Sequence, residues 1–269
     1  MVTELLLDQH PILTWLFMFA ILLLVTELSY RFGRRRSKDS PVSDKHERGV
    51  GIIASAMLGL LAFMLAISLS MADGRFDYRR KLILEEANAI GTAHLRAQTI
   101  GGPHGAQIMR LLRDYTKLRL DFFAAGEDQK RLKTIYEQTA IVQQEIWEHA
   151  SAVAGLSPTP ITGILLQSLN QVFDLATAGR WGLEVRVPLH VIRLLYLFSL
   201  LSAGMMGYYL SLSGYRHLIL SSLLLFAFAA AMMLITDLNK PRSGYIRAEQ
   251  SALIWTFESL KGNRHEMNH

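Results

Sequence analysis

The chain has 269 residues, of which 51% are hydrophobic and 19% are charged, and its mean hydropathy is +0.22. This apolar fraction is high for a water-soluble protein of that length, and the apolar residues are concentrated in a few segments. The formal net charge of +5 comes mostly from one loop, so it does not indicate nucleic-acid binding. There is no cysteine, which excludes disulfides, cysteine-containing zinc sites and thiol nucleophiles.

Four segments are nearly free of charge and approach or reach the roughly 20 residues that cross a hydrocarbon core of about 30 Å. They are residues 11–26, 51–72, 194–215 and 218–236. The first could be mistaken for a signal peptide, but Glu4 and Asp8 precede it, no basic residue does, and no small-residue cleavage site follows. The sequence therefore predicts an all-α integral membrane protein with four transmembrane helices, the first one retained.

These spans divide the chain into seven regions. They are an N-terminal segment with the first span (1–30), a basic loop (31–49), the second span (50–72), a helical extramembrane domain (73–188), the third span (189–212), the fourth span (217–236) and a C-terminal tail (237–269).

The loop between the first two spans carries seven basic residues, which are Arg31, Arg34, Arg35, Arg36, Lys38, Lys45 and Arg48. Such an excess in a short loop indicates the cytoplasmic side of a membrane. We therefore expect both termini and the 73–188 domain to face outward, into the periplasm if the cell is Gram-negative.

The 73–188 domain is predicted to be helical throughout, because strand-like alternation and hairpin turns are scarce. Glycine and proline interrupt the pattern at 101–103, 124–126 and 157–160. The helices expected between these breaks cover approximately 76–99, 104–123, 128–154 and 161–179.

A row of small residues follows one face of the second span. It consists of Gly51, Ser55, Gly59, Ala62, Ala66, Ser70 and Gly74. Small residues at this spacing let helices approach closely in lipid. The row is either a pore-lining or subunit-contacting face, or it packs against another span of the same chain. The third span has a similar row, and the two rows could pack together; that row is Ser199, Ala203, Gly207 and Ser211.

Charged residues crowd the segment that follows the second span. The spacing predicts ion pairs Asp77–Lys81 and Lys81–Glu85, whereas Arg75 and Arg79 should repel unless an acid lies nearby. The cluster is either a self-paired, solvated helix surface or a functional group of charges at the membrane edge. The candidate residues are Asp73, Arg75, Asp77, Arg79, Arg80, Lys81, Glu85, Glu86, Asn88, Arg96, Asp237, Lys240 and Arg242.

The last three of these residues follow the fourth span, on the same side of the membrane as the others. Pro241 and Gly244 are expected to end the helix and turn the chain back. Lys240 and Arg242 could then reach Asp73, Asp77 or Glu85, or their stems could instead lie along the membrane interface.

Motifs of soluble enzymes are missing. The GGPHGA segment around His104 lacks the Lys-Ser/Thr of a phosphate-binding loop and indicates a helix break. Glu145 and His149 lie one helical turn apart, but no second pair of metal ligands accompanies them. We therefore expect no catalytic activity, no bound metal and no cofactor.

Residues 59–97 resemble the signature of bacterial four-span membrane proteins called bestrophin-like. That signature has a span ending in Arg75, Phe76, Asp77, Arg79 and Arg80, then Glu86 to Thr92 (EANAIGT) and Arg96. Segments 169–180 and 187–191 are similar to the entry into the family's third span. Segment 237–244 is similar to the element after its fourth span, although Asn239 and Lys240 stand where the family has Asp and Arg.

The resemblance implies kinship with bestrophins, which are pentameric anion channels with pore-lining second spans. One hypothesis is thus an oligomeric ion channel in a bacterial cytoplasmic (inner) membrane, with membrane lipid, further copies of the chain and inorganic ions as partners. The second span would line the pore, and the charged helix would form a vestibule. A slight preference for anions rests on Arg75, Arg79, Arg80 and Lys81.

The alternative hypothesis is a non-conducting membrane scaffold or sensor whose helical outer domain binds a partner. A pore face should carry polar residues along its whole length. The second span is polar only at Ser55, Ser68 and Ser70, and Ser68 lies off the face that carries the small residues.

Overall fold

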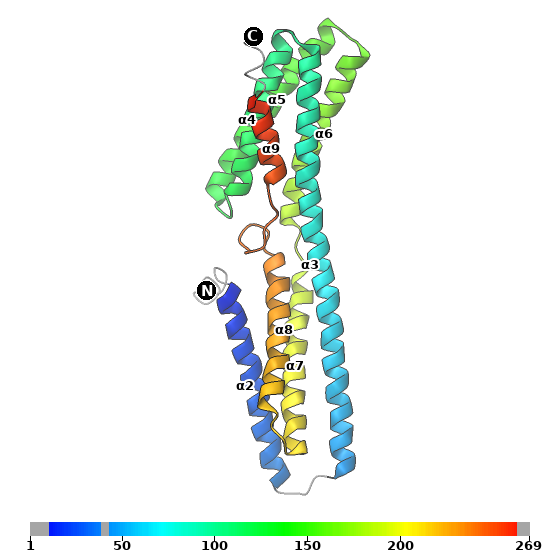
Figure 1. Ribbon diagram of the computed structural model, residues 1–269, viewed down its shortest axis with the longest axis vertical. Helices are drawn as coiled ribbons and strands as arrows, with labels where there is room; N and C mark the ends of the chain where they lie inside the picture. Colours follow the sequence, from blue (N-terminus) through cyan, green and yellow to red (C-terminus); the bar gives the residue numbers. More distant parts are fainter. Residues whose placement is uncertain (1–10, 39–42, 263–269) are drawn as a thin grey trace. The chain divides into compact units, whose positions relative to one another are not determined.

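The computed structural model describes residues 11–38 and 43–262, and no strand occurs among them (Figure 1). Glu4 and Asp8, on which the interpretation of the first span depends, lie outside the described residues. The helices are α2 (Pro11–Lys38), α3 (Asp44–Ile100), α4 (Gly102–Ala124), α5 (Gln129–Leu156), α6 (Pro160–Glu184), α7 (Leu189–Ser213), α8 (Leu218–Leu238) and α9 (Ser251–Gly262). The predicted all-α class is confirmed.

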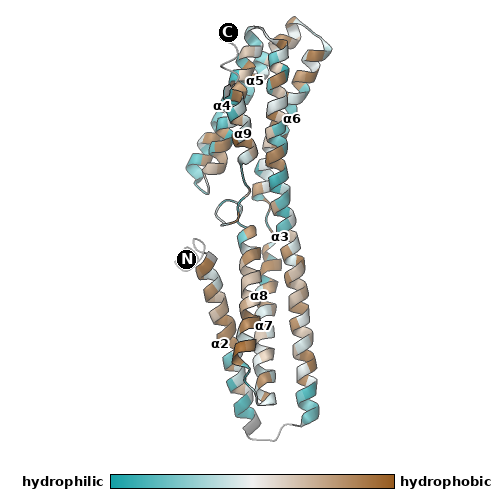
Figure 2. Ribbon diagram, in the orientation of Figure 1, coloured by the Kyte–Doolittle hydropathy of each residue, from teal (hydrophilic) through white to brown (hydrophobic). Residues whose placement is uncertain are grey.

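Four helical ranges are long and apolar enough to cross a membrane. They are Ile12–Arg36, Asp44–Ile100, Pro160–Ser213, which includes α7, and Leu218–Leu238. Figure 2 shows hydrophobic residues along α2, α7, α8 and the first half of α3. The prediction of a four-span membrane protein is therefore confirmed.

The chain forms two compact units, and α3 contributes to both. The membrane unit contains the described residues up to Gly74, together with Arg186–Lys240 and Gly244–Ile246. The helical unit contains Arg75–Val185, Pro241–Ser243 and the described residues from Arg247 onward.

In the membrane unit, the small residues of α7 let α2 approach closely. The carbonyl oxygen of Ala203 accepts a hydrogen bond from Thr26 Oγ1 at 3.2 Å. A Cβ atom on Gly207 would lie only 2.2 Å from the Thr26 carbonyl oxygen. At the same end of the row, a Cβ atom on Gly33 of α2 would collide with the Ser211 hydroxyl. The third-span row thus packs mainly against the first span, and not against the small-residue row of the second.

Gly207→Ala is expected to lower the free energy of unfolding by about 1–3 kcal/mol, because the methyl group would force α2 and α7 apart. Thermal unfolding of the purified protein in detergent would measure the loss. Gly204→Ala is the matched control on the same helix, since its Cβ would lie 3.4 Å from Ser29 Oγ. Equal destabilisation by both variants would contradict this explanation.

The helical unit has its own core, formed by the second half of α3 with α4, α5, α6 and α9. Several of its large apolar residues are at most 1% exposed, among them Ile90, Ile108, Leu112, Ile146, Leu165, Leu169 and Leu253. Each predicted break separates two of these helices. Gly101 and Gly102 adopt positive φ angles of 63° and 64° between α3 and α4, and Thr159 and Thr162 form a capping box at the start of α6.

The region assigned from the sequence as a C-terminal tail contains a helix, α9, that completes this core. Leu253 is fully buried and Leu260 is 8% exposed. The side chain of Thr256 donates a hydrogen bond to the Ala87 carbonyl oxygen at 3.4 Å. The α9 part of the tail therefore belongs to the helical unit, and its buried residues Leu253 and Leu260 lie seven positions apart on one helix face.

Candidate functional site

The charged segment of α3 has two faces. Its outward face carries the exposed side chains of Asp73, Asp77, Arg80, Lys81 and Asn88, and the half-buried ones of Arg75, Glu85 and Arg96. Its inward face carries Arg79, which is 4% exposed, and Glu86, which is 1% exposed. Arg79 and Glu86 are seven residues apart and share their face with buried Ile83 and Ile90. The predicted cluster is therefore divided between solvent and core.

The outward charges largely pair with each other. The Lys81–Glu85 pair that the spacing predicts is present at 3.7 Å. Asp77 pairs with Arg80 at 3.9 Å, three residues on, instead of with Lys81. Such exposed ion pairs each contribute less than about 1 kcal/mol to the free energy of unfolding.

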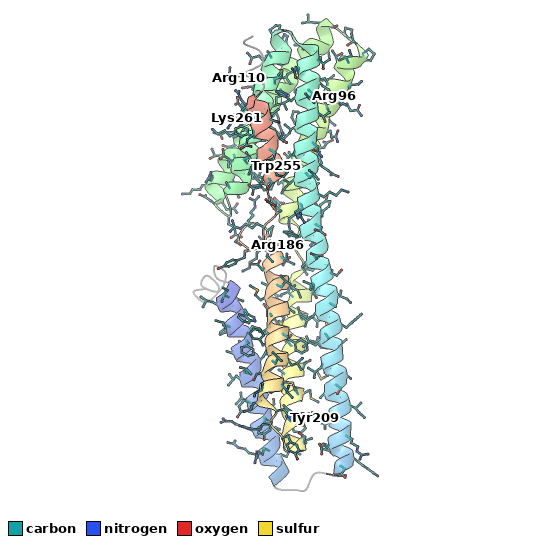
Figure 3. The ribbon with its side chains drawn as sticks, viewed as in Figure 1. Arg96, Arg110, Arg186, Tyr209, Trp255 and Lys261 are labelled. Carbon is teal, nitrogen blue, oxygen red and sulfur yellow. The ribbon has the colours of Figure 1, made fainter. Side chains whose placement is uncertain are left out.

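Arg96, labelled in Figure 3, lies near the end of α3 and contacts a neighbouring helix. Its Nη1 donates a hydrogen bond to the Ile164 carbonyl oxygen of α6 at 3.2 Å. This contact connects the last turns of α3 to the first turn of α6 within the helical unit.

Glu86 forms a buried ion pair with Arg119 of α4. Arg119 Nε lies 2.5 Å from Glu86 Oε1, and Arg119 Nη2 donates to Glu86 Oε2 at 3.1 Å. The two side chains are 4% and 1% exposed. The hydroxyl of buried Tyr115 donates to Glu86 Oε1 at 3.2 Å. Both carboxylate oxygens are thus hydrogen-bonded, as the burial of an ionised group requires.

Aromatic rings and a glycine surround this pair. The Arg119 guanidinium carbon lies 4.6 Å from the centre of the Phe122 ring. A Cβ atom on Gly179 of α6 would lie 3.2 Å from Arg119 Nη2, so only a very small residue leaves room for the guanidinium.

The guanidinium carbon of Arg242 also lies 4.6 Å from the Phe122 ring centre. Its Nη1 donates to the Gly126 carbonyl oxygen at 3.2 Å.

Arg242 therefore contacts α4 and the turn that follows it. Among the described residues of the helical unit, no ion pair joins Arg242 to Asp77 or Glu85. Burial lowers the pKa of Arg242.

Electrostatics keep Arg119 and Tyr115 protonated. Burial acts to lower the pKa of Arg119, but the charge and hydrogen bonds of Glu86, together with Tyr115 and Tyr136, outweigh burial and raise the pKa. Burial and the Glu86 charge both raise the pKa of Tyr115, so its hydroxyl remains a hydrogen-bond donor. The group is suited to bracing α3 against α4 and not to proton transfer.

Sequence reasoning missed Arg119 and Tyr115. A signal was present, because Ile108, Leu112, Tyr115 and Arg119 recur at helical spacing and place an arginine on an apolar face. An arginine there needs a buried acid, and Glu86 lies on the apolar face of α3. Glu86 and Arg119 are 33 positions apart in the sequence, so no local sequence pattern could predict the pairing.

Asp237 stabilises the turn after α8. Its side chain is 2% exposed, and its two carboxylate oxygens accept hydrogen bonds from the backbone N–H groups of Tyr245 and Ile246, both at 2.9 Å. A Cβ atom on Gly244 would lie 2.6 Å from the Asp237 carbonyl oxygen, and Lys240 donates its backbone N–H to that oxygen at 2.9 Å. Asp237 therefore acts on the local backbone of the turn.

The small-residue row of α3 is directed away from the other described helices of the membrane unit. Six of its members are exposed, namely Ser55, Gly59, Ala62, Ala66, Ser70 and Gly74. A Cβ atom on Gly59 or Gly74 would meet nothing within 4 Å. Gly51 is the exception, because its Cβ would lie 2.8 Å from the ring of Tyr209 on α7, labelled in Figure 3.

The opposite face of the same span packs inward. It is formed by Ala54, Leu61, Leu65, Ser68 and Ala72, each at most 6% exposed. Ser68 thus belongs to the packing face, which agrees with its position off the small-residue row.

The helical unit also brings together two histidines. Nδ1 of His104, in the first turn of α4, lies 3.0 Å from Nδ1 of His149 on α5. In the described part of the chain, no group of three or more His, Cys, Asp or Glu side chains could hold a metal ion. The pair comes from positions 45 residues apart and has no local sequence signature.

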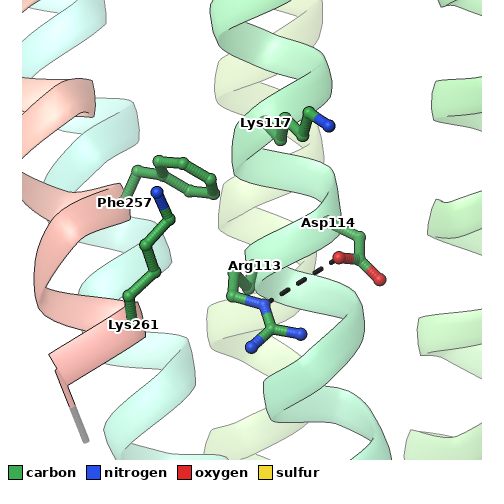
Figure 4. Close-up of a pocket in the computed structure, with 5 residues that line it drawn as sticks. All are labelled: Arg113, Asp114, Lys117, Phe257 and Lys261. Atoms are coloured by element: carbon green, nitrogen blue, oxygen red, sulfur yellow. Dashed lines mark ion pairs between the residues drawn. The ribbon is translucent and has the colours of Figure 1, made fainter. Parts of the chain in front are cut away.

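A basic pocket of about 450 Å³ lies between α4 and α9 (Figure 4). It is lined by Arg113, Asp114, Lys117, Phe257 and Lys261. Lys261 Nζ lies 4.1 Å from the Phe257 ring centre, and Arg113 pairs with Asp114 at 3.9 Å. This pocket depends on α9 and could not be expected from the sequence.

The fold is similar to those of solved membrane proteins. A bacterial bestrophin homologue from Klebsiella pneumoniae is 16% identical, with a TM-score of 0.64 over 95% of this chain and 97% of that one. A substituted form of the Klebsiella pneumoniae homologue gives 16% identity and a TM-score of 0.65 over 95% and 98% of the two chains. Another crystal structure, described as that of a membrane protein, is 15% identical, with a TM-score of 0.66 over 96% and 99%.

The family of the chain is established by comparison of its sequence with known families. A search of curated proteins finds no match to this chain. The family model of the Bestrophin-like domain, by contrast, matches residues 17–253, which is most of the chain. The chain therefore belongs to the Bestrophin-like family.

Proposed function

We propose that this protein is an oligomeric ion channel of a bacterial inner membrane, in which residues 50–72 of α3 line the pore. The observation that carries the proposal is the outward direction of the small-residue row on α3. Among the described residues of the chain, the row has almost no partner, which favours a pore or a subunit contact over packing within the chain.

The exposed side of this span is divided into two strips. Ile53, Leu60 and Ile67 lie seven residues apart and are 54%, 44% and 45% exposed, which suits contact with lipid. The small-residue row lies beside them. Small residues offer little contact to lipid but permit close approach of another helix or passage of an ion. The row therefore favours a pore or a subunit contact.

The exposed charges after this span would line the entrance. Arg79 cannot contribute to such a wall, because its side chain is buried. The preference for anions that we propose rests instead on Arg75, Arg80 and Lys81. Asp77 and Glu85 pair with two of these cations and make the preference weak.

A non-conducting scaffold or sensor is the second candidate function. The observation that favours it is the burial of Ser68, which leaves Ser55 and Ser70 as the polar side chains on the exposed side of this span. The hydrophobic centre of the row would then hold subunits together without an aqueous path.

Ion flux from liposomes that contain the purified oligomer distinguishes the two functions. We expect flux under an anion gradient, and a smaller flux under a cation gradient. A well-folded oligomer without flux across pH, calcium concentration and membrane tension would exclude the channel and leave the scaffold.

Charge reversal at Arg80 is expected to lower the ratio of anion to cation flux by about threefold or more, since Coulomb's law gives about 1 kcal/mol per unit charge at 4 Å in water before screening. Arg80 is exposed, so the fold should be retained. Arg110→Glu, an exposed reversal on α4, is the control for net charge. If Arg80→Glu conducts with unchanged selectivity, this segment is not the filter.

A further inference from the structure

A pocket of about 300 Å³ opens in the membrane unit near the end of α2. It is lined by Tyr30, Arg31, Arg34, Arg35 and Arg216. The first four residues belong to the last turns of α2, and Arg216 lies in the short connection between α7 and α8. All five belong to one compact unit.

Two side chains hold three of the arginines in place. Tyr30 is 4% exposed, its hydroxyl accepts a hydrogen bond from Arg34 Nη1 at 2.9 Å, and its ring lies 4.5 Å from the Arg216 guanidinium carbon. Glu27 Oε1 accepts from Arg31 Nε at 2.7 Å and from Arg216 Nη2 at 2.9 Å. The guanidinium groups are therefore ordered before a ligand arrives, which reduces the entropic cost of binding.

The pocket has an excess of positive charge. Four guanidinium groups face one carboxylate, that of Glu27, which gives a formal charge of +3 (4 − 1). Arg35 makes no ion pair or hydrogen bond with the side chains described in residues 12–36 and 43–261. Planar guanidinium groups bind phosphate through paired N–H donors, so the lining of this pocket suits a phosphate.

The position of the pocket indicates where that phosphate comes from. α2, α7 and α8 are all spanning helices, and the pocket lies at the ends of α2 and α7 and the start of α8. Phe32, Tyr215 and Leu218 beside the arginines are 62%, 71% and 56% exposed. Exposed aromatic and aliphatic side chains next to basic residues are typical of the headgroup layer of a bilayer.

We propose that this arginine pocket binds the phosphate of an anionic phospholipid in the leaflet at this end of the spans. A run of arginines that only oriented the chain in the membrane would not need the Glu27 and Tyr30 contacts. The proposal does not depend on ion conduction, since it concerns a different part of the molecule from the pore face of α3.

The test compares lipids on the full-length protein in detergent. The shift in thermal unfolding temperature would be titrated with phosphatidylglycerol, phosphatidylcholine or inorganic phosphate. The variant Arg35→Lys/Arg216→Lys keeps the charge and the orientation signal but removes the guanidinium forks. We expect it to weaken apparent phosphatidylglycerol binding about fivefold or more. Arg36→Lys/Arg48→Lys, two exposed residues outside the pocket, is the matched control and should bind as the unmodified protein does.

Tyr30→Phe is a second test variant, and it does not change the charge of the pocket. It removes the hydroxyl that positions Arg34, and we expect weaker phosphatidylglycerol binding with little change in the unfolding temperature of the lipid-free protein. Three results would overturn the proposal: equal weakening by both double variants, unchanged binding by Tyr30→Phe and Arg35→Lys/Arg216→Lys, or full reproduction of the phosphatidylglycerol effect by inorganic phosphate alone. The last result would assign the pocket to a free anion.

Discussion

Arg119→Met is expected to lower the free energy of unfolding by about 3–5 kcal/mol, because it leaves the carboxylate of Glu86 buried without its partner. The side chains of the pair are 4% and 1% exposed, so water cannot replace the lost contacts. Denaturant or thermal unfolding of the purified protein in detergent, followed by circular dichroism, would measure the loss. Lys81→Met is the matched control, since it breaks an exposed pair on the same helix and should cost less than about 1 kcal/mol.

The double variant Glu86→Leu/Arg119→Met distinguishes the cost of an unpaired buried charge from the cost of lost packing. Removing both charges leaves no unpaired group, so the double variant should be markedly more stable than Arg119→Met alone. If the double variant loses as much stability as the sum of the two single variants, the cost comes from lost packing and not from an unpaired charge.

Gly59→Trp is expected to reduce ion flux by on the order of tenfold or more, which corresponds to a barrier increase of about 1.4 kcal/mol. The side chain would enter the space that we propose for the pore or for a neighbouring subunit. The fold of the single chain should survive, since a Cβ atom at this position meets nothing within 4 Å. Flux in liposomes and light scattering of the detergent-solubilised oligomer would be measured together.

Leu60→Trp is the control for Gly59→Trp. Leu60 is 44% exposed and lies on the neighbouring strip that we assign to lipid, so the same bulk should leave flux and assembly nearly unchanged. A Gly59→Trp protein with normal flux and a normal oligomer would show that the small-residue row faces lipid.

Sequence reasoning succeeded where a property depends on neighbouring residues. The breaks at Gly101–Gly102 and around Thr159 follow from glycine conformation and from capping, which act within a few residues. The Lys81–Glu85 pair was also predictable, because residues four apart on a helix are neighbours. For Asp77 the prediction was wrong, because the spacing was taken to pair it with Lys81, four residues on, and the structure pairs it with Arg80, three residues on.

The sequence could not show which face of α3 packs inside the chain and which face is exposed. Glycine and serine at four-residue spacing are equally consistent with a contact inside the chain and with one outside it. Whether the small residues of α3 are covered within the chain depends on the packing of α7. The small residues of α7 pack against α2 and not against those of α3. In the same way, Glu86 was one charge among many until α4 placed Arg119 against it.

The sequence by itself determined the four apolar spans, the breaks between the helices of the domain and the family signature, because all three depend on composition and local order. The tertiary structure alone decided which members of the charged cluster are buried and which side of the second span is left open. It also decided that the C-terminal segment contributes a helix to the core. The physical reason is that burial and pairing are properties of contacts between distant residues, here Glu86 with Arg119 and Thr26 with Gly207, and no local pattern contains them.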